Sequence, residues 1–195
     1  MAQWDVVVIG AGPGGYPAAI RAAQLGFETL CIEREKAGGV CLNWGCIPSK
    51  ALLKTAELVH KIEHAKDFGL EVAGLNIDYP AVIARSRKTA ERFEKGVHGL
   101  FKKYGVTWQA GDAVVLGAGR VKLGDEEHTC KHLILATGAR AKIFPGLNLD
   151  GERVVTYREA IVSTFRPKSV TVLGSGAIGM EFAWFWHMMG AEVTV

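Results

Sequence analysis

The sequence has little cysteine, little net charge and no long uninterrupted apolar run. Its 195 residues contain four cysteines and carry a formal net charge of +3, which excludes a small disulfide-rich secreted scaffold and a strongly basic nucleic-acid surface. The aromatic stretch AWFWHMM follows Glu181, contains His187 and is too short to cross a bilayer. No basic region with a following apolar segment precedes the first strand-like run. We therefore expect a cytoplasmic protein, with no nucleic-acid and no membrane partner.

Two stretches of the chain repeat each other at an offset of 164 residues. Residues 6–33 read VVVIGAGPGGYPAAIRAAQLGFETLCIE, and residues 170–195 read VTVLGSGAIGMEFAWFWHMMGAEVTV. Each copy has an apolar strand-like run, G-x-G-x-x-G, a helical stretch and a second strand-like run, which is the dinucleotide-binding βαβ pattern. The aligned glycines are Gly10, Gly12 and Gly15 in the first copy and Gly174, Gly176 and Gly179 in the second.

This pattern predicts a pyrophosphate site at each helix N-terminus, where free N–H groups meet the positive end of the helix dipole. The first copy also ends in Glu33, 23 residues after Gly10, and an acid there can accept hydrogen bonds from an adenosine ribose. The offset places the counterpart of Glu33 at position 197. We therefore expect the chain to be part of a longer protein, interrupted inside its second nucleotide-binding unit.

The stretch between the repeats predicts further helices and strands. Residues 80–104 have the pattern of a long amphipathic helix, and an apolar strand ends at Thr137-Gly138. The loop FPGLNLDG is typical of a domain junction, and TYREAIVS of a short helix. Short strands are expected at 106–110, 113–117, 120–123 and 127–132.

The segment GGVCLNWGCIPSK, residues 38–50, contains two cysteines five positions apart. Zinc ligation would need further ligands nearby, and no second cysteine pair follows; His60 and His64 alone are more typical of a solvated helix face, so no metal site is expected. A pair of inert buried thiols is a second interpretation. A redox disulfide is favoured, because Gly45 and Pro48 can distort a helix on which the two Cα atoms would be about 8.6 Å apart, and Lys50 favours a thiolate.

The segment GGVCLNWGCIPSKALL resembles the active-site segment of the FAD-dependent disulfide oxidoreductases, most closely the dihydrolipoamide dehydrogenases. GAGPGGYPAAIRAAQLG, LILATGAR and GSGAIGMEFA also resemble segments of that family, in the same order. The resemblance implies an α/β fold: a Rossmann-like FAD-binding domain with a small antiparallel β insertion, over 1–147, and the truncated start of a second Rossmann-like NAD-binding domain, over 148–195.

The resemblance also implies which residues contact the two cofactors. The first βαβ would bind the ADP half of FAD, and the second would bind NAD. The implied FAD contacts are Gly10, Gly12, Pro13, Gly14, Gly15, Glu33, Arg34, Gly39, Val40, Cys41, Cys46, Lys50, Ala113, Thr137, Gly138 and Ala139. The implied contacts on the NAD side are Gly174, Ser175, Gly176, Ala177, Ile178, Gly179 and Glu181.

The family's chemistry gives four of these residues catalytic roles. Electrons would pass from dihydrolipoamide to the Cys41–Cys46 disulfide, then to FAD and then to NAD. Cys41 would exchange with the lipoyl sulfur, Cys46 would lie against the flavin, and Lys50 would pair with Glu181. The implied partners are a lipoyl domain of a 2-oxo acid dehydrogenase complex or the H protein of glycine cleavage, and a second copy in a homodimer.

The sequence also departs from the family pattern. Val40 stands where threonine is usual, Trp44 replaces a small apolar residue, and Gly179 in place of alanine favours NAD over NADP. The family's His–Glu base is not assigned to any histidine of this chain, so we expect the chain alone to be inactive in NAD-linked turnover. A related disulfide or mercuric reductase, and a nucleotide-binding module without catalysis, remain alternatives.

Overall fold

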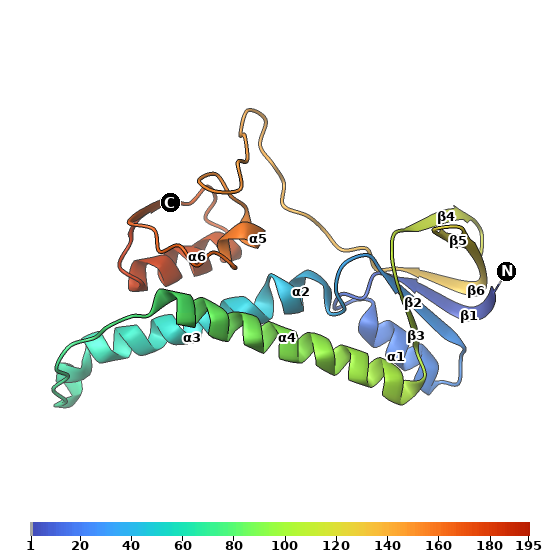
Figure 1. Cartoon of the computed structure of the whole chain (residues 1–195), viewed down its shortest axis with the longest axis horizontal. Coiled ribbons are helices and arrows are strands. Elements are labelled where there is room, and N and C mark those ends of the chain that lie inside the picture. Colours follow the sequence, from blue (N-terminus) through green and yellow to red (C-terminus); the bar gives the residue numbers. More distant parts are fainter. Residues whose placement is uncertain (1) are drawn as a thin grey trace. The chain divides into compact units, whose positions relative to one another are not determined.

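The computed structural model describes residues 2–195, which form two compact units. Among the described residues, one unit comprises 2–43 and 91–140, and the other comprises 44–90 and 141–195. Both are α/β in construction (Figure 1). The expected division into nucleotide-binding domains at residue 147 stays a prediction.

The first unit is built on a six-stranded sheet of order β3-β2-β1-β6-β5-β4. β1, β2, β3 and β6 run parallel, whereas β4 and β5 join through antiparallel pairs. The Rossmann-like pattern with a small antiparallel addition, expected from the sequence, is therefore confirmed. The strands are β1 (Ala2–Ile9), β2 (Thr29–Glu33), β3 (Thr107–Ala110), β4 (Ala113–Gly117), β5 (Arg120–Leu123) and β6 (Glu126–Leu135).

The parallel strands are apolar because both faces of the sheet are covered at its centre. Val7, Leu30 and Ile32 are fully buried, and Val121 of β5 packs in the same cluster. One expectation was wrong. The short strand expected at 127–132 and the apolar strand expected directly after it form a single ten-residue strand, β6. Its first residues pair with β5 and its last residues pair with β1 alone, so one strand serves both the insertion and the parallel sheet.

The helices of the chain follow the expected pattern closely. α1 (Tyr16–Gln24) has a proline in its first turn, where no intrahelical hydrogen bond is lost. α4 (Tyr79–Tyr104) starts one residue earlier than the sequence indicates, and α5 (Tyr157–Ala160) is shorter. The remaining helices are α2 (Gly39–Asn43), α3 (Cys46–Glu63), the short 3-10 helix η1 (Ala65–Phe68) and α6 (Ala177–Met188).

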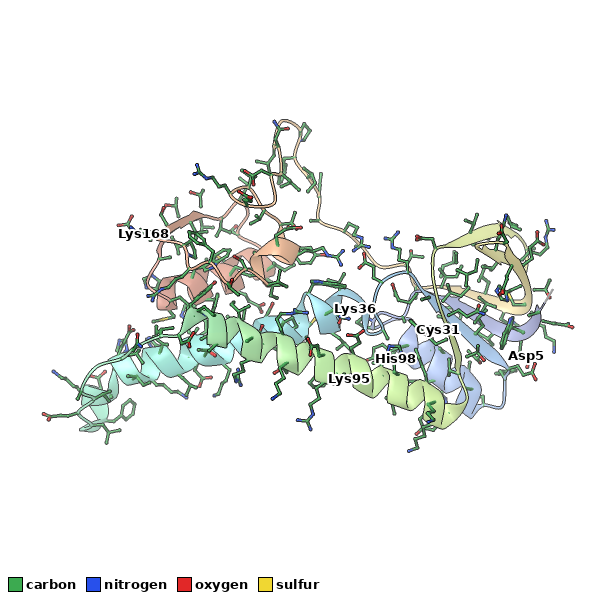
Figure 2. The ribbon with its side chains drawn as sticks, viewed as in Figure 1. Asp5, Cys31, Lys36, Lys95, His98 and Lys168 are labelled. Atoms are coloured by element: carbon green, nitrogen blue, oxygen red, sulfur yellow. The ribbon has the colours of Figure 1, made fainter. Side chains whose placement is uncertain are left out.

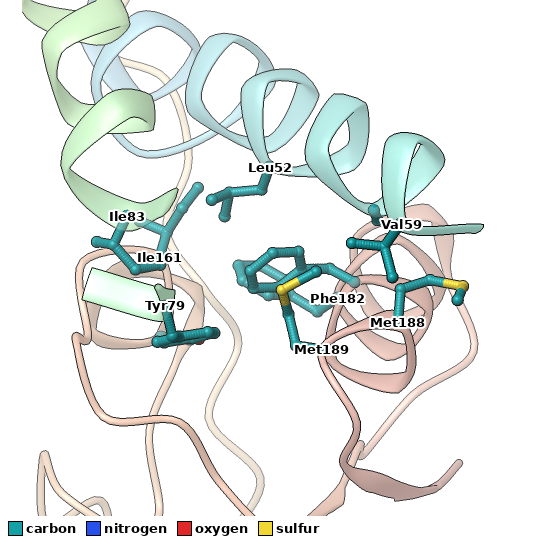
Figure 3. Packing of buried hydrophobic residues seen from close by; sticks show 11 residues of the cluster. Leu52, Val59, Tyr79, Ile83, Ile161, Phe182, Met188 and Met189 are labelled. Atoms are coloured by element: carbon teal, nitrogen blue, oxygen red, sulfur yellow. The ribbon is translucent and has the colours of Figure 1, made fainter. Parts of the chain in front are cut away.

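The second unit has its own apolar core, shown in Figure 3. Leu52 of α3, Ile83 of α4 and Ile161 after α5 pack with Phe182 and Phe185 of α6. β7 (Ser169–Thr171) and β8 (Glu192–Thr194) form a parallel pair on either side of α6 in the sequence, which is a second βαβ unit. The aromatic run of α6 supplies packing residues, since Phe182 and Phe185 are buried in this core.

Candidate functional site: a glycine cradle and a disulfide

The first glycine-rich turn lies at the carboxyl edge of the parallel sheet. β1, β2 and β6 run in the same direction with β1 in the middle, so their ends meet at this edge. The Ala136 N–H donates to the Ile9 carbonyl at 2.8 Å, so the chain leaving β6 runs past the turn. Ligands of open α/β sheets bind at this edge, where neighbouring strands lead to opposite sides.

Two positions of this turn accept only glycine. Gly10 has φ of +98°, and a Cβ there would overlap the carbonyl oxygen of Ala136. A Cβ on Gly15, at the start of α1, would overlap the carbonyl oxygen of Gly10. These are the tight turn and the close packing of helix on strand that the motif predicts. The N-terminus of α1 is thereby held directly above the end of β1.

A second loop packs against the turn through glycine. Gly39 has φ of +57°, and a Cβ there would lie 2.6 Å from the Cα of Gly12. The Gly38 N–H donates to the Ala11 carbonyl at 2.7 Å, which fixes the approach. At Gly12 and Gly14 an added Cβ would meet nothing closer than 3.8 Å. The two loops therefore present bare backbone rather than side chains, a surface that a pyrophosphate can approach closely.

Glu33 lies at the end of β2, beside this cradle. Its carboxylate accepts hydrogen bonds from the Ala11 N–H at 2.8 Å and from the Glu35 N–H at 2.9 Å. A carboxylate offers about four lone-pair sites, so acceptor capacity remains for ribose hydroxyls. Arg34 forms an exposed ion pair with Asp112 at 3.7 Å.

The other residues implied for FAD lie at the same edge or next to it. Thr137, Gly138 and Ala139 follow β6 in an exposed segment, and Gly138 has φ of +70°. Ala113 starts β4 and is half-buried. Val40 follows Gly39 in α2. Their contacts with a cofactor stay predictions.

Cys41 and Cys46 are joined by a disulfide. Cys41 lies in α2, Cys46 begins α3, and Gly45 between them has φ of −130° and ψ of −116°. The helix therefore breaks between the cysteines, as the spacing predicts. In α3 the Ser49 N–H donates to the Gly45 carbonyl at 2.9 Å, so the helix resumes at once. Cys41 is half-buried, and Cys46 is exposed.

The two remaining cysteines, Cys31 and Cys130, are free thiols. Cys31 is fully buried in β2 (Figure 2), and this burial, reinforced by the charge of Glu33, raises the pKa of its thiol to about 12. Burial also raises the pKa of the Cys130 thiol. Both thiols stay protonated near neutral pH and are poor nucleophiles. Thiol–disulfide chemistry is therefore concentrated at Cys41 and Cys46.

The raised pKa of Cys31 predicts a stability that falls in alkali. Below pH 9.0, the ordinary pKa of a cysteine thiol, Cys31 is protonated in both the folded and the unfolded protein. Between pH of about 9 and about 12, the thiol loses its proton only in the unfolded protein. The free energy of unfolding should fall by about 1.4 kcal/mol per pH unit in that window. Urea titrations from pH 8 to 11 measure this slope. In Cys31→Ala the fall should be shallower by that amount, and equal slopes in the two proteins would contradict the assignment.

Asn43 is a site residue that the sequence reasoning missed. Its side chain is 1% exposed, and its amide nitrogen donates to the carbonyl oxygens of Ala37 and Gly39, both at 3.0 Å. It therefore fastens the end of α2 to the loop that packs on Gly12. The available signal was a polar residue between two cysteines in a segment otherwise rich in apolar side chains.

Trp44, which is unusual for the family, has a defined place in the structure. It is partly buried against the core of the second unit, and the Arg158 guanidinium lies over its ring, 4.0 Å from the centroid. Arg158 is held in α5, which starts with a capping box formed by Thr156 and Glu159. Trp44 thus fills space that a small residue would leave empty. It also makes a cation–π contact from the segment between the two cysteines of the disulfide.

A double-mutant cycle should detect this contact. The coupling energy between Trp44→Leu and Arg158→Ala is expected to be about 0.5–1 kcal/mol, because the contact is partly exposed. Urea unfolding of the parent, both single variants and the double variant measures it. Arg153→Ala, at an exposed loop position, paired with Trp44→Leu is the control. A coupling as small as the control's would contradict the contact.

Lys50 and Glu181 lie in the second unit. Lys50 is exposed in the first turns of α3, whereas Glu181 of α6 lines a small cavity with Ser49, Leu52 and Phe182. Among residues 2–195 no ion pair joins Lys50 to Glu181. The proposed pairing therefore stays a prediction.

The second glycine-rich turn repeats the geometry of the first. Gly174 has φ of +112°, and a Cβ on Gly179 would overlap the Gly174 carbonyl oxygen. In the same way, a Cβ on Gly15 would overlap the Gly10 carbonyl oxygen. Gly176 caps α6, and its carbonyl accepts from the Met180 N–H at 3.0 Å. Ser175, Ala177 and Ile178 occupy this turn and the start of the helix.

Comparison with known proteins decides the family. The sequence model of the pyridine nucleotide-disulphide oxidoreductase family matches residues 4–195. The chain belongs to this family. Its members use FAD and NAD, and the bare glycine cradle, the free acceptor capacity of Glu33 and the second glycine turn fit those two nucleotides.

Similar family members include several dihydrolipoyl dehydrogenases. That of Rhizobium etli is 45% identical to the chain, covering 99% of it and 44% of the relative. That of Mycobacterium tuberculosis is 47% identical, covering 100% and 43%. The chain thus spans less than half the length of these relatives.

Solved structures agree on the fold. LpdA of Mycobacterium tuberculosis superposes with a TM-score of 0.86 at 28% identity, over 99% of this chain and 44% of that one. RclA of Escherichia coli, an HOCl-induced flavoprotein disulfide reductase, gives a TM-score of 0.83 at 22% identity, over 97% and 41%, and supports the fold alone. No helix among the described residues is both long and apolar enough to span a membrane.

Proposed function

We propose that the chain provides the FAD-binding and dithiol parts of a dihydrolipoyl dehydrogenase. The observation that carries this proposal is the disulfide between Cys41 and Cys46, which starts two residues after Gly39 of the glycine cradle. The names of the dihydrolipoyl dehydrogenases to which the chain is similar support the lipoyl substrate. A lipoyl domain of a 2-oxo acid dehydrogenase complex is the proposed partner, and a homodimer the proposed assembly.

The cradle residues bind and orient the nucleotide. The N–H groups at the start of α1 and the bare backbone of Gly12 and Gly14 would face the pyrophosphate. Glu33 would accept hydrogen bonds from the ribose hydroxyls. Since Glu33 also holds the Ala11 N–H, ribose binding and the shape of the turn depend on one carboxylate. FAD, when bound, would supply a two-electron acceptor for the dithiol, with NAD as the final acceptor.

The two cysteines perform the exchange with substrate. A thiolate of the dihydrolipoyl group attacks the Cys41 sulfur, which forms a mixed disulfide and releases Cys46 as a thiolate. The second substrate thiolate attacks the substrate sulfur of that mixed disulfide, closes the lipoyl ring and releases Cys41. Two electrons pass to the cysteine pair, and the two protons of the substrate dithiol leave to a base or to solvent. Lys50, by its positive charge, would stabilise the Cys46 thiolate.

Trapping with a linear disulfide probe, 4,4′-dithiodipyridine, tests the roles of the two cysteines, because lipoamide carries a second thiol that would close its ring and release the adduct. In Cys46→Ser, the remaining Cys41 thiol should form a stable mixed disulfide with one half of the probe, because the other half leaves and no neighbouring thiol can release the adduct. In Cys41→Ser, adduct formation at Cys46 should be at least about tenfold slower when FAD is bound. Peptide mass mapping locates the adduct. Equal trapping at both positions, or faster trapping at Cys46, would reverse the assignment.

A further inference from the structure

Three side chains of metal-ligand type meet on the last turn of α3, away from Cys46 at the start of this helix. His60, Glu63 and His64 are spaced i, i+3 and i+4, so they share one face of the helix. Their ligand atoms all lie within 4.8 Å of one another, and all three side chains are exposed. We propose that these residues bind a divalent transition-metal ion of the Zn²⁺ class.

The orientation of His64 supports ligation. Its Nδ1 lies 2.8 Å from the backbone carbonyl oxygen of His60. Because a carbonyl only accepts, Nδ1 carries the proton, and the lone pair is on Nε2. Metal-bound histidines show this arrangement, with one ring nitrogen donating to a carbonyl and the other facing the ion. The two imidazole rings lie side by side, with centroids 4.1 Å apart.

The charge of the surroundings also favours a cation. His64 caps the C-terminus of α3, where the last carbonyls give the negative end of the helix dipole. The Glu63 carboxylate adds a negative charge. Of the nearby lysines, Lys61 is engaged with Glu57 one turn earlier. The short helix η1, which follows directly, contributes one lysine and one acid, Lys66 and Asp67.

The donor set selects the kind of metal. Two imidazoles and one carboxylate suit Zn²⁺, Cu²⁺ or Ni²⁺, whereas Mg²⁺ and Ca²⁺ prefer oxygen ligands alone. Three protein ligands leave the remaining positions to water. From the sequence the histidine pair suggested only a solvated face, since neither the third ligand nor the tautomer of His64 was apparent. An ion here would clamp the last turn of the helix that begins at Cys46.

Zinc titration calorimetry of the oxidised chain tests the site, because Cys41 and Cys46 are then held in their disulfide. The parent should bind about one equivalent. His60→Ala and His64→Ala should each weaken binding by at least about tenfold, and Glu63→Gln by a smaller factor. His187→Ala, at an exposed helix position, is the control and should bind as the parent does. No zinc binding by the parent, or binding unchanged in the two site variants, would overturn the proposal.

A spectroscopic readout keeps the test independent of small stability changes. The electron paramagnetic resonance spectrum of the chain with one equivalent of Cu²⁺ should show hyperfine splitting from two imidazole nitrogens, and from one in His64→Ala. Circular dichroism of the variants confirms that they fold. A spectrum with oxygen ligands alone, or one identical in parent and His64→Ala, would contradict the site.

Discussion

Alanine in place of Gly15 should lower the free energy of unfolding by about 3 kcal/mol or more and abolish measurable FAD binding. The added Cβ would overlap the Gly10 carbonyl oxygen, which is backbone and cannot turn away as a flexible side chain could. Either α1 or the end of β1 must move. Urea unfolding and flavin fluorescence titration measure the two losses.

Gly96→Ala is the matched control for this substitution. Gly96 lies on the exposed side of α4, and an added Cβ there would meet nothing within 4 Å. Alanine should therefore stabilise the helix by about 0.5–1 kcal/mol and leave FAD binding unchanged. Equal effects of the two substitutions, or normal FAD binding by Gly15→Ala, would contradict the role given to the cradle.

Leucine in place of Asn43 should cost about 2–4 kcal/mol, because the carbonyls of Ala37 and Gly39 would each lose a buried donor. Asn43→Asp should be at least as damaging, since a carboxylate only accepts and would face the same two oxygens. Both variants should also loosen the contact of Gly39 with Gly12 and so weaken FAD binding.

Asn148→Asp, at an exposed loop position, controls for the change of charge and should leave both properties unchanged. Urea unfolding compares the three variants with the parent. If Asn43→Leu unfolds at the same urea concentration as the parent, the two hydrogen bonds do not hold the loop.

The sequence predicts the two βαβ units because glycine spacing and apolar runs are local signals. Gly10 and Gly15 each accept only glycine, so the pattern is dictated by overlap of backbone atoms, and the repeat at Gly174 and Gly179 follows the same rule. The break between Cys41 and Cys46 was equally predictable, since a helix cannot bring them within disulfide range.

Other features depend on contacts between segments far apart in the sequence. The union of two strand-like runs into β6 depends on pairing with both β1 and β5, which no local pattern encodes. Asn43 is recognised only once the loop carbonyls are seen to converge on it. Arg158 was not connected with Trp44 because 113 residues separate them in the sequence and only tertiary packing brings them together.

The cysteine pair and a flavin held by the cradle should exchange electrons. The most direct test of this exchange is the visible absorbance of the FAD-loaded chain after anaerobic addition of one equivalent of dihydrolipoamide. The flavin spectrum of the parent should change, and this change should be lost in Cys41→Ser and in Cys46→Ser. An unchanged spectrum in a parent carrying one FAD, or the same change in both variants, would contradict this exchange.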